Sequence, residues 1–68
     1  MDFYEKKQKA MSLINEFAIG NKHTKEQIAF FVLKETGFGK AFVFNYIEES
    51  ILNGLLLTDK KTGVVFVA

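Results

Sequence analysis

Residues 24–68 contain two helical patterns followed by two short apolar runs, and this order constrains the fold more than any other feature of the chain. The helical patterns are separated by Gly37-Phe38-Gly39, and the apolar runs are joined by Asp59-Lys60-Lys61-Thr62-Gly63. Glycine adopts the backbone conformations that end helices and close hairpins. The order therefore predicts a helix-turn-helix that runs directly into a β-hairpin.

Length and composition limit the chain to one small domain. A chain of 68 residues buries only about 60% of its unfolded surface, yet a hydrophobic content of 49% is enough for a core. The lack of cysteine excludes a disulfide framework and a thiolate metal site. No apolar run reaches the roughly 18 residues of a membrane span, and residues 1–5 lack a signal-peptide pattern. We expect a single domain over residues 1–68, located in the cytoplasm and not associated with a membrane.

A first helix is predicted from Asp2 to about Phe17. Asp2 followed by Glu5 fits a capping pattern at its start, and Gly20-Asn21 fits a left-handed end. Lys22-His23 is then expected to be extended, as a short stub strand against the hairpin. The apolar residues that recur at helical spacing are Phe3, Ala10, Leu13, Ile14 and Phe17.

The second helix has the sharpest local signal. The Thr24 hydroxyl can accept from the amide of Gln27 while the Gln27 side chain reaches back, which is a capping box. This helix is expected to run to about Glu35, with Gly37 supplying the positive φ of a sharp exit. Phe38 is interpreted as an apolar plug between the second and third helices.

The third helix is predicted from about Lys40 to Asn53, with Gly54 as its stop. Residue placement at 100° intervals gives a buried side of Val43, Phe44, Ile47 and Ile51. The opposite side carries Phe42, Asn45, Glu49 and Asn53. Leu55–Thr58 and Val64–Val67 are the predicted strands. The expected fold is α+β, with three helices and a C-terminal hairpin.

The eight phenylalanines are expected mainly in the core of this fold. The members that the pattern favours most are Phe3, Phe17, Phe31, Phe44 and Phe66.

A resemblance to the winged helix-turn-helix superfamily rests on three stretches, which are residues 24–29, Gly37-Phe38-Gly39, and the series Val43, Ile47 and Gly54-Leu55-Leu56. The small size is similar to that of compact regulators found in archaea and their plasmids and viruses. The resemblance implies a double-stranded DNA-binding protein that acts as a transcriptional regulator. Its third helix would enter the major groove, and its hairpin, the wing, would touch the DNA backbone.

By position, the resemblance also implies a set of DNA-binding residues. Base-facing positions fall on Lys40, Ala41, Phe42, Asn45 and either Glu48 or Glu49. Wing positions that face phosphate are Lys60, Lys61 and Thr62, and the helix start at Thr24 and Lys25 can meet phosphate through its free amides. Asn45 is the best candidate for base readout, because an amide pairs bidentately with the adenine edge. Phe42 has three open interpretations, which are a thymine methyl contact, a dimer contact, or packing under the wing.

Charge favours an alternative function. The formal net charge is only +1, and all nine positive residues are lysines, which lack the planar fork that reads guanine. Glu48 and Glu49 lie on the third helix, where many relatives have basic residues. A winged helix used as a protein-binding adaptor without DNA binding therefore remains the second hypothesis. A continuous positive band over the third helix and wing would favour DNA, and an acidic or apolar patch would favour a protein partner.

No pattern predicts catalysis, a metal, a cofactor or a small-molecule ligand. His23 has no second histidine or cysteine beside it, so a structural role is favoured. Glu48 and Glu49 are adjacent on a helix and point about 100° apart, so they cannot flank one bond. A monomer of this size offers few phosphate contacts, so we expect a homodimer, with the lysine-bearing first helix as its contact surface.

Overall fold

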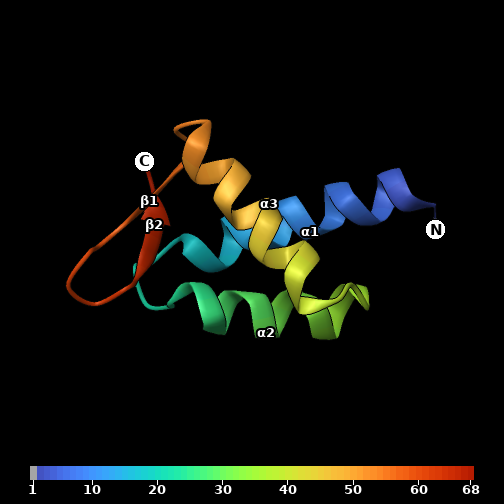
Figure 1. Cartoon of the computed structure of the whole chain (residues 1–68), viewed down its shortest axis with the longest axis horizontal. Helices are drawn as coiled ribbons and strands as arrows, with labels where there is room; N and C mark the ends of the chain where they lie inside the picture. Colours follow the sequence, from blue (N-terminus) through green and yellow to red (C-terminus); the bar gives the residue numbers. More distant parts are fainter. Residues whose placement is uncertain (1) are drawn as a thin grey trace.

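The computed structural model describes residues 2–68 and has three helices followed by a two-stranded antiparallel sheet. The elements are α1 (Phe3–Ala18), α2 (Lys25–Thr36), α3 (Lys40–Leu52), β1 (Leu56–Thr58) and β2 (Val65–Val67), drawn in Figure 1. This α+β arrangement confirms the predicted fold class and is consistent with a winged-helix layout. The three predicted helices and the two predicted hairpin strands exist, with bounds that differ by about one residue at some ends.

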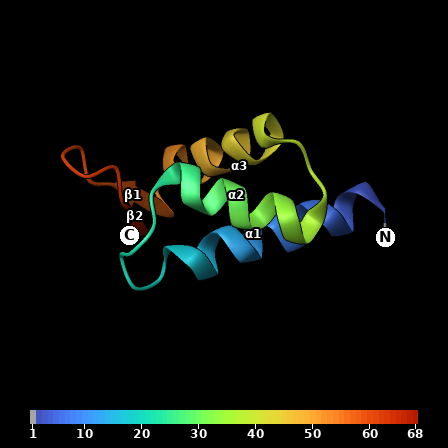
Figure 2. The ribbon, with the colours of Figure 1, turned by 90° about the horizontal axis from the view of Figure 1, so that it is seen from below.

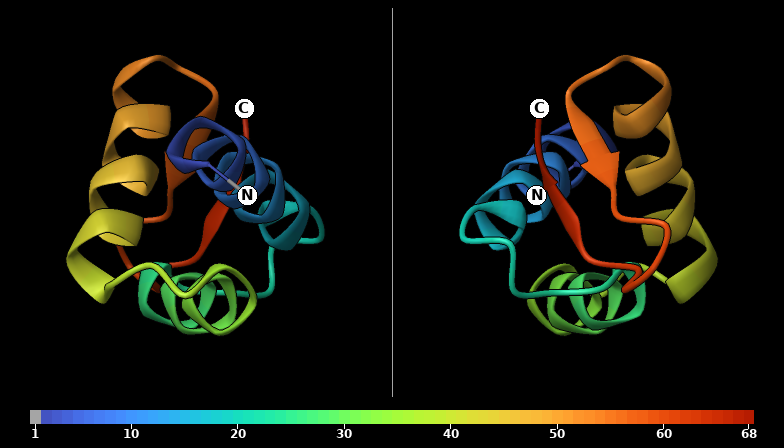
Figure 3. Two further views of the ribbon diagram at one scale, coloured as in Figure 1. Left: turned by 90° about the vertical axis from the view of Figure 1, so that its right-hand side faces the viewer. Right: turned by 90° about the vertical axis from the view of Figure 1, so that its left-hand side faces the viewer.

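The helices surround a common centre, and the hairpin lies at one end of the molecule. α1 and α2 follow the long axis, and α3 crosses them at a steep angle (Figures 1 and 2). The end views show the three helices around one interior, with the hairpin closing the end opposite the N-terminus (Figure 3). Across residues 2–68, no helix combines the length and the apolar character that a bilayer crossing requires.

The predicted helix caps are present. The Asp2 carboxylate accepts from the Glu5 amide at 2.8 Å, which starts α1. At the start of α2, the Thr24 amide donates to Gln27 Oε1 at 2.9 Å and the Gln27 amide donates to Thr24 Oγ1 at 3.3 Å. α2 ends at Gly37, whose φ of 77° is left-handed and whose amide donates to the Leu33 carbonyl at 2.8 Å. The capping box and the glycine exit are both confirmed.

The link between α1 and α2 ties the helices to the hairpin. Gly20 and Asn21 both have positive φ, 99° and 56°, as expected for a left-handed helix end. The stub strand predicted at Lys22-His23 is reduced to one antiparallel bridge between Thr24 and Val64. The Val65 amide also donates to the His23 carbonyl at 2.9 Å. The segment before α2 therefore pairs with the hairpin at one residue, Thr24, which directly follows the predicted Lys22-His23.

The hairpin has a regular register that turns one face toward the helices. Leu56 pairs with Val67, Leu57 with Phe66, and Thr58 with Val65. Leu56 and Val65 are buried and belong to the main core. The wing is therefore packed onto the body through one apolar residue from each strand.

The core is aliphatic rather than aromatic, which corrects the expectation for the phenylalanines. Its fully buried large side chains are Ile14, Ile28, Val32, Val43, Ile47, Leu56 and Val65. Ala10, Ala18 and Ala29 are also buried, and their small size is suited to close helix contacts. Among the described residues no phenylalanine is fully buried. Phe17, Phe38 and Phe44 are packed against the core, and Phe31 and Phe66 are half-buried. The phenylalanine rings therefore lie around the interior, and Tyr46 is the aromatic residue of the core.

Phe3 was predicted in the core, and this is wrong. Its side chain is 60% exposed, because the first turn of α1 extends past the ends of α2 and α3 (Figure 1). Its ring meets the Phe38 ring edge-on at 5.8 Å between centroids. Phe38 also lies 5.8 Å from the Tyr46 ring and so joins α1 to α3, as well as linking the helices of the turn.

The buried side of α3 is rotated relative to the prediction. Val43 and Ile47 are buried as expected, but Tyr46 and Ser50 accompany them. Phe44 and Ile51, predicted on the buried side, are only partly buried. The rotation arises because α1 packs beside α3 and covers one flank of it, which helical spacing alone does not reveal. The residues predicted on the opposite side, Phe42, Asn45, Glu49 and Asn53, are all exposed.

Candidate nucleic-acid interface

One row of exposed residues on α3 consists of Ala41, Asn45, Glu48 and Leu52 and is called here the outward row. Successive members are three or four positions apart, so they lie on one helix face. The first two side chains are short and the last is an uncovered leucine, 85% exposed. The sequence predicted Ala41 and Asn45 at this surface. It did not predict Leu52, whose exposure depends on the rotation of α3.

Lys40 flanks the row at the start of α3. Its ammonium lies 5.3 Å from the centre of the Phe44 ring, so the aliphatic part of the side chain follows the helix surface. The residue is exposed. Lys40 thus remains available to an anionic partner at the edge of the row.

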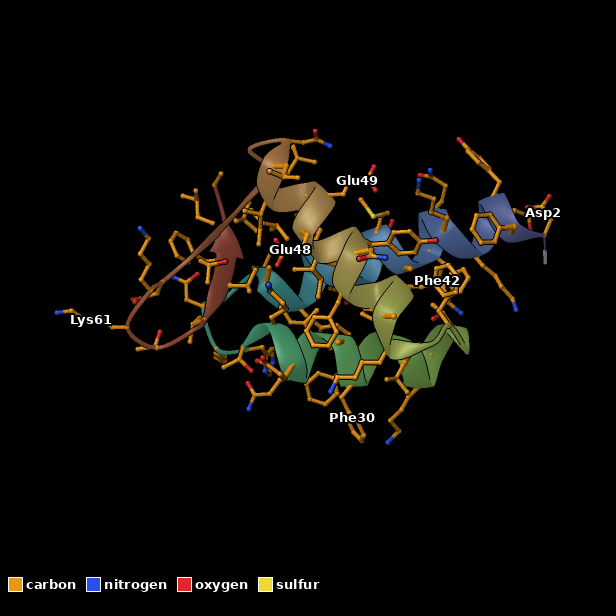
Figure 4. The ribbon with its side chains drawn as sticks, viewed as in Figure 1. Asp2, Phe30, Phe42, Glu48, Glu49 and Lys61 are labelled. Atoms are coloured by element: carbon orange, nitrogen blue, oxygen red, sulfur yellow. The ribbon has the colours of Figure 1, made fainter. Side chains whose placement is uncertain are left out.

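Phe42 is 53% exposed and lies 6.2 Å from the Phe38 ring, at the start of α3. Figure 4 shows Phe42 far along the molecule from Lys61 at the tip of the hairpin. Packing under the wing, one of its three interpretations, is therefore wrong. Contact with DNA and contact with a partner chain remain as its two interpretations.

Lys25 at the start of α2 forms an ion pair with Glu48 of the outward row. The two side chains are 28% and 49% exposed, so the pair is at the surface. The amide of the neighbouring Thr24 is used within the capping box. The helix start predicted to contact phosphate is therefore partly occupied by groups of the protein itself.

The hairpin loop is held by the carboxylate of Asp59. Its Oδ1 accepts from the amides of Lys61 at 2.8 Å and Thr62 at 3.3 Å, and the Gly63 amide donates to the Asp59 carbonyl at 2.8 Å. Thr62 Oγ1 accepts from the Val64 amide at 3.2 Å. The loop polar groups thus serve its own turn, and the side chains of Lys60 and Lys61 are exposed. Lys61 projects away from the body at the tip (Figure 4).

Positive charge on this surface is not continuous. Its cations are Lys25, Lys40, Lys60 and Lys61, and its anions are Glu48, Glu49 and Asp59. Lys25–Glu48 is the single ion pair within residues 2–68, so the ammonium groups of the hairpin carry no such pair. The free positive charge is concentrated at the hairpin tip and at the first turn of α3, with acidic side chains between them.

Two further features lie outside this surface. An open groove of about 450 Å³ separates α1, the end of α3 and the hairpin, and no charged residue lines it. Its lining includes Met11, Leu55 and Val67.

His23 lies edge-on to the rings of Phe17 and Phe31, with 6.0 and 5.2 Å between the ring centroids, so it has a packing role. Within residues 2–68, no three histidine or acidic side chains lie close enough together to hold a metal ion.

The candidate surface therefore combines an uncovered helix face with short side chains, a lysine at each end, and acidic residues between them. Such a surface can hydrogen bond through Asn45 and attract anions through Lys40, Lys60 and Lys61. No protein-family model, curated protein or solved structure matches this chain.

Proposed function

We propose that this chain is a double-stranded DNA-binding protein of the winged helix-turn-helix kind that regulates transcription in the cytoplasm. The observation that carries the proposal is the outward row of α3. Ala41 and Asn45 are exposed there, and their short side chains add little to the width of the helix on this face. A major groove accepts an α-helix whose short side chains allow close approach to base edges. The role proposed for the chain is binding, with no catalytic step.

The proposed roles differ between α3 and the hairpin. Asn45 reads a base edge, and Lys40 contacts a base or a neighbouring phosphate at the start of the helix. Lys60, Lys61 and Thr62 hold the flanking backbone, where lysine serves as a point charge. The hydrogen bonds that Asp59 makes within the loop support this role, because they hold the loop that carries both lysines in one conformation.

Fluorescence anisotropy of a labelled random-sequence duplex, titrated at three salt concentrations, tests the proposal. We expect micromolar affinity that weakens steeply with salt. Replacing Lys60 and Lys61 together by alanine should weaken binding to every duplex and flatten the salt slope by about two units. The matched control replaces Lys9 and Lys22, two exposed lysines outside α3 and the hairpin. Absence of binding at low salt would contradict the proposal.

We also propose that two copies act together on DNA. The apolar residues in the middle of α1 face the core, so an α1 contact between copies would use the exposed Phe3 and Tyr4 at its start. A symmetric pair is the usual arrangement for small DNA-binding domains. If α1 forms the contact, replacing Tyr4 by serine should reduce cooperative binding and leave the affinity of a single copy unchanged.

A protein-binding adaptor is the second candidate function. The acidic residues Glu48 and Glu49, the exposed Leu52 and the exposed Phe42 favour it, because an apolar and acidic helix face suits a protein partner better than phosphate. The same anisotropy titration separates the two candidates. Failure to bind any duplex at low salt, with the chain folded, would favour the adaptor.

A further inference from the structure

Glu48 has a position that no other acidic residue of α3 shares. It is a member of the outward row, and its carboxylate holds the ammonium of Lys25, which is 23 residues earlier in the chain. The neighbouring Glu49 is also exposed but takes no part in an ion pair within residues 2–68. The two side chains project from different sides of α3 (Figure 4).

We propose that Glu48 competes with DNA phosphate for Lys25 and thereby sets the affinity of the interface. This inference rests on the proposed DNA-binding function. Carboxylate and phosphate oxygens both accept charge-assisted hydrogen bonds from an ammonium, so they are alternative partners for the same group. While Glu48 holds Lys25, the interface has one lysine fewer for phosphate and one negative charge on the face of α3.

The exposure of the pair makes exchange between the two partners feasible. With side chains 28% and 49% exposed, the ion pair is solvated and contributes little to folding. A phosphate can therefore displace the carboxylate at small cost, and the protein stays folded when it does. Glu48 acts as an internal competitor that lowers affinity for every duplex, which leaves discrimination to Asn45.

The test uses the full chain and four variants, Glu48→Gln, Glu49→Gln, Lys25→Gln and the double variant Glu48→Gln/Lys25→Gln. Binding to a random-sequence duplex is measured by anisotropy at three salt concentrations. We expect Glu48→Gln to bind about five- to tenfold more tightly at 0.1 M salt, with a salt slope steeper by about 0.9, which is the contribution of one phosphate contact. Glu49→Gln, which changes the net charge equally, should give a smaller gain because it releases no lysine.

The coupling between the two residues is the decisive readout. Lys25→Gln should change affinity little in the presence of Glu48. In the Glu48→Gln background it should reduce the gain to the level that Glu49→Gln gives, because only the part due to the released lysine is lost. Equal gains from Glu48→Gln and Glu49→Gln would overturn the inference in favour of a general charge effect. Additive effects of Glu48→Gln and Lys25→Gln would overturn it as well.

Failure of this inference can be distinguished from failure of the proposed function. If the unmodified chain binds DNA with a steep salt dependence but Glu48→Gln behaves like Glu49→Gln, only the role of Glu48 is lost. If neither the unmodified chain nor any variant binds at low salt, both are overturned. Circular dichroism of each variant establishes that the substitutions leave the fold intact.

Discussion

Tyr46 has a buried hydroxyl with no hydrogen-bond partner, the single such side-chain atom within residues 2–68. Its ring is well packed, edge-on to Phe38 at 5.8 Å and with the Lys7 ammonium 5.5 Å from its centre. Burying a hydroxyl without a partner costs about 1–3 kcal/mol in proteins. The Tyr46 ring therefore stabilises the contact between α1 and α3, whereas its unpaired hydroxyl lowers the free energy of unfolding.

Replacing Tyr46 by phenylalanine should leave stability unchanged or raise the free energy of unfolding by about 1 kcal/mol, because it removes only the unsatisfied oxygen. Urea unfolding followed by circular dichroism measures the change. The exposed Tyr4 offers a control, since its replacement by phenylalanine should have no effect. A loss of more than about 1 kcal/mol in the Tyr46 variant would show that the hydroxyl has a partner.

Asn45 is the residue of the outward row suited to read a base. Replacing it by alanine should relax the preference at one base position by about 1–3 kcal/mol and leave nonspecific affinity nearly intact, because Asn45 contributes no charge. Selection from a random duplex library, performed on both proteins, gives the preference at each position. A uniform loss of affinity across all sequences would contradict a reading role.

Individual elements owe their ends to local chemistry, and the glycine at the end of α2 shows this most clearly. Gly37 has a φ of 77°, and a Cβ built there would meet no atom within 4 Å. Any cost of a larger residue therefore comes from backbone strain alone. The same turn sets the angle between α2 and α3, so it also determines where the outward row faces.

Replacing Gly37 by alanine should lower the free energy of unfolding by about 1 kcal/mol, since the left-handed conformation strains an L-residue. Replacement by asparagine should cost less, because asparagine tolerates this conformation. Thermal unfolding of both variants provides the comparison. Equal losses would indicate that a steric contact, and not φ, is responsible.

The hairpin is attached to the core by the buried residues of its strands, which alternate with exposed ones. Leu56 is buried, whereas Leu57, its neighbour in β1, is exposed. Replacing Leu56 by alanine should cost about 2–5 kcal/mol, enough to unfold much of a domain this small. Replacing Leu57 should cost less than about 1 kcal/mol. Unfolding curves from far-ultraviolet circular dichroism and from tyrosine fluorescence, which reports Tyr4 in α1 and Tyr46 in α3, should coincide. Separate transitions would contradict unfolding in one step.

The whole molecule is long, 36 × 21 × 19 Å, with its candidate functional charges spread over that length. Of the four lysines at the candidate interface, one is already paired, so a single copy neutralises few phosphates. We therefore expect two chains on each selected operator, with half-sites about one helical turn apart. Sedimentation of the complex gives the stoichiometry. A single chain on an asymmetric site would contradict this expectation.

Much of the fold could be predicted because the signals are local. The capping box joins residues three positions apart, the glycine ends depend on one φ angle, and the hairpin follows from a short loop between β-rich runs. Helical spacing also predicted the exposure of Phe42, Asn45 and Glu49 on α3, whereas Ala41 was placed at the candidate site by the resemblance. These features need no knowledge of how the helices pack.

Tertiary structure alone decided which apolar residues are inside and which charges are paired. Eight phenylalanines suggested an aromatic core, but alanine, valine, isoleucine and leucine fill most of the interior, and Tyr46 is its aromatic member. The packing of α1 beside α3 buried Tyr46 and turned Leu52 outward. The Lys25–Glu48 pair joins residues of different helices. Hydrogen bonds over three or four residues define elements, whereas burial and long-range ion pairs depend on the relative positions of those elements.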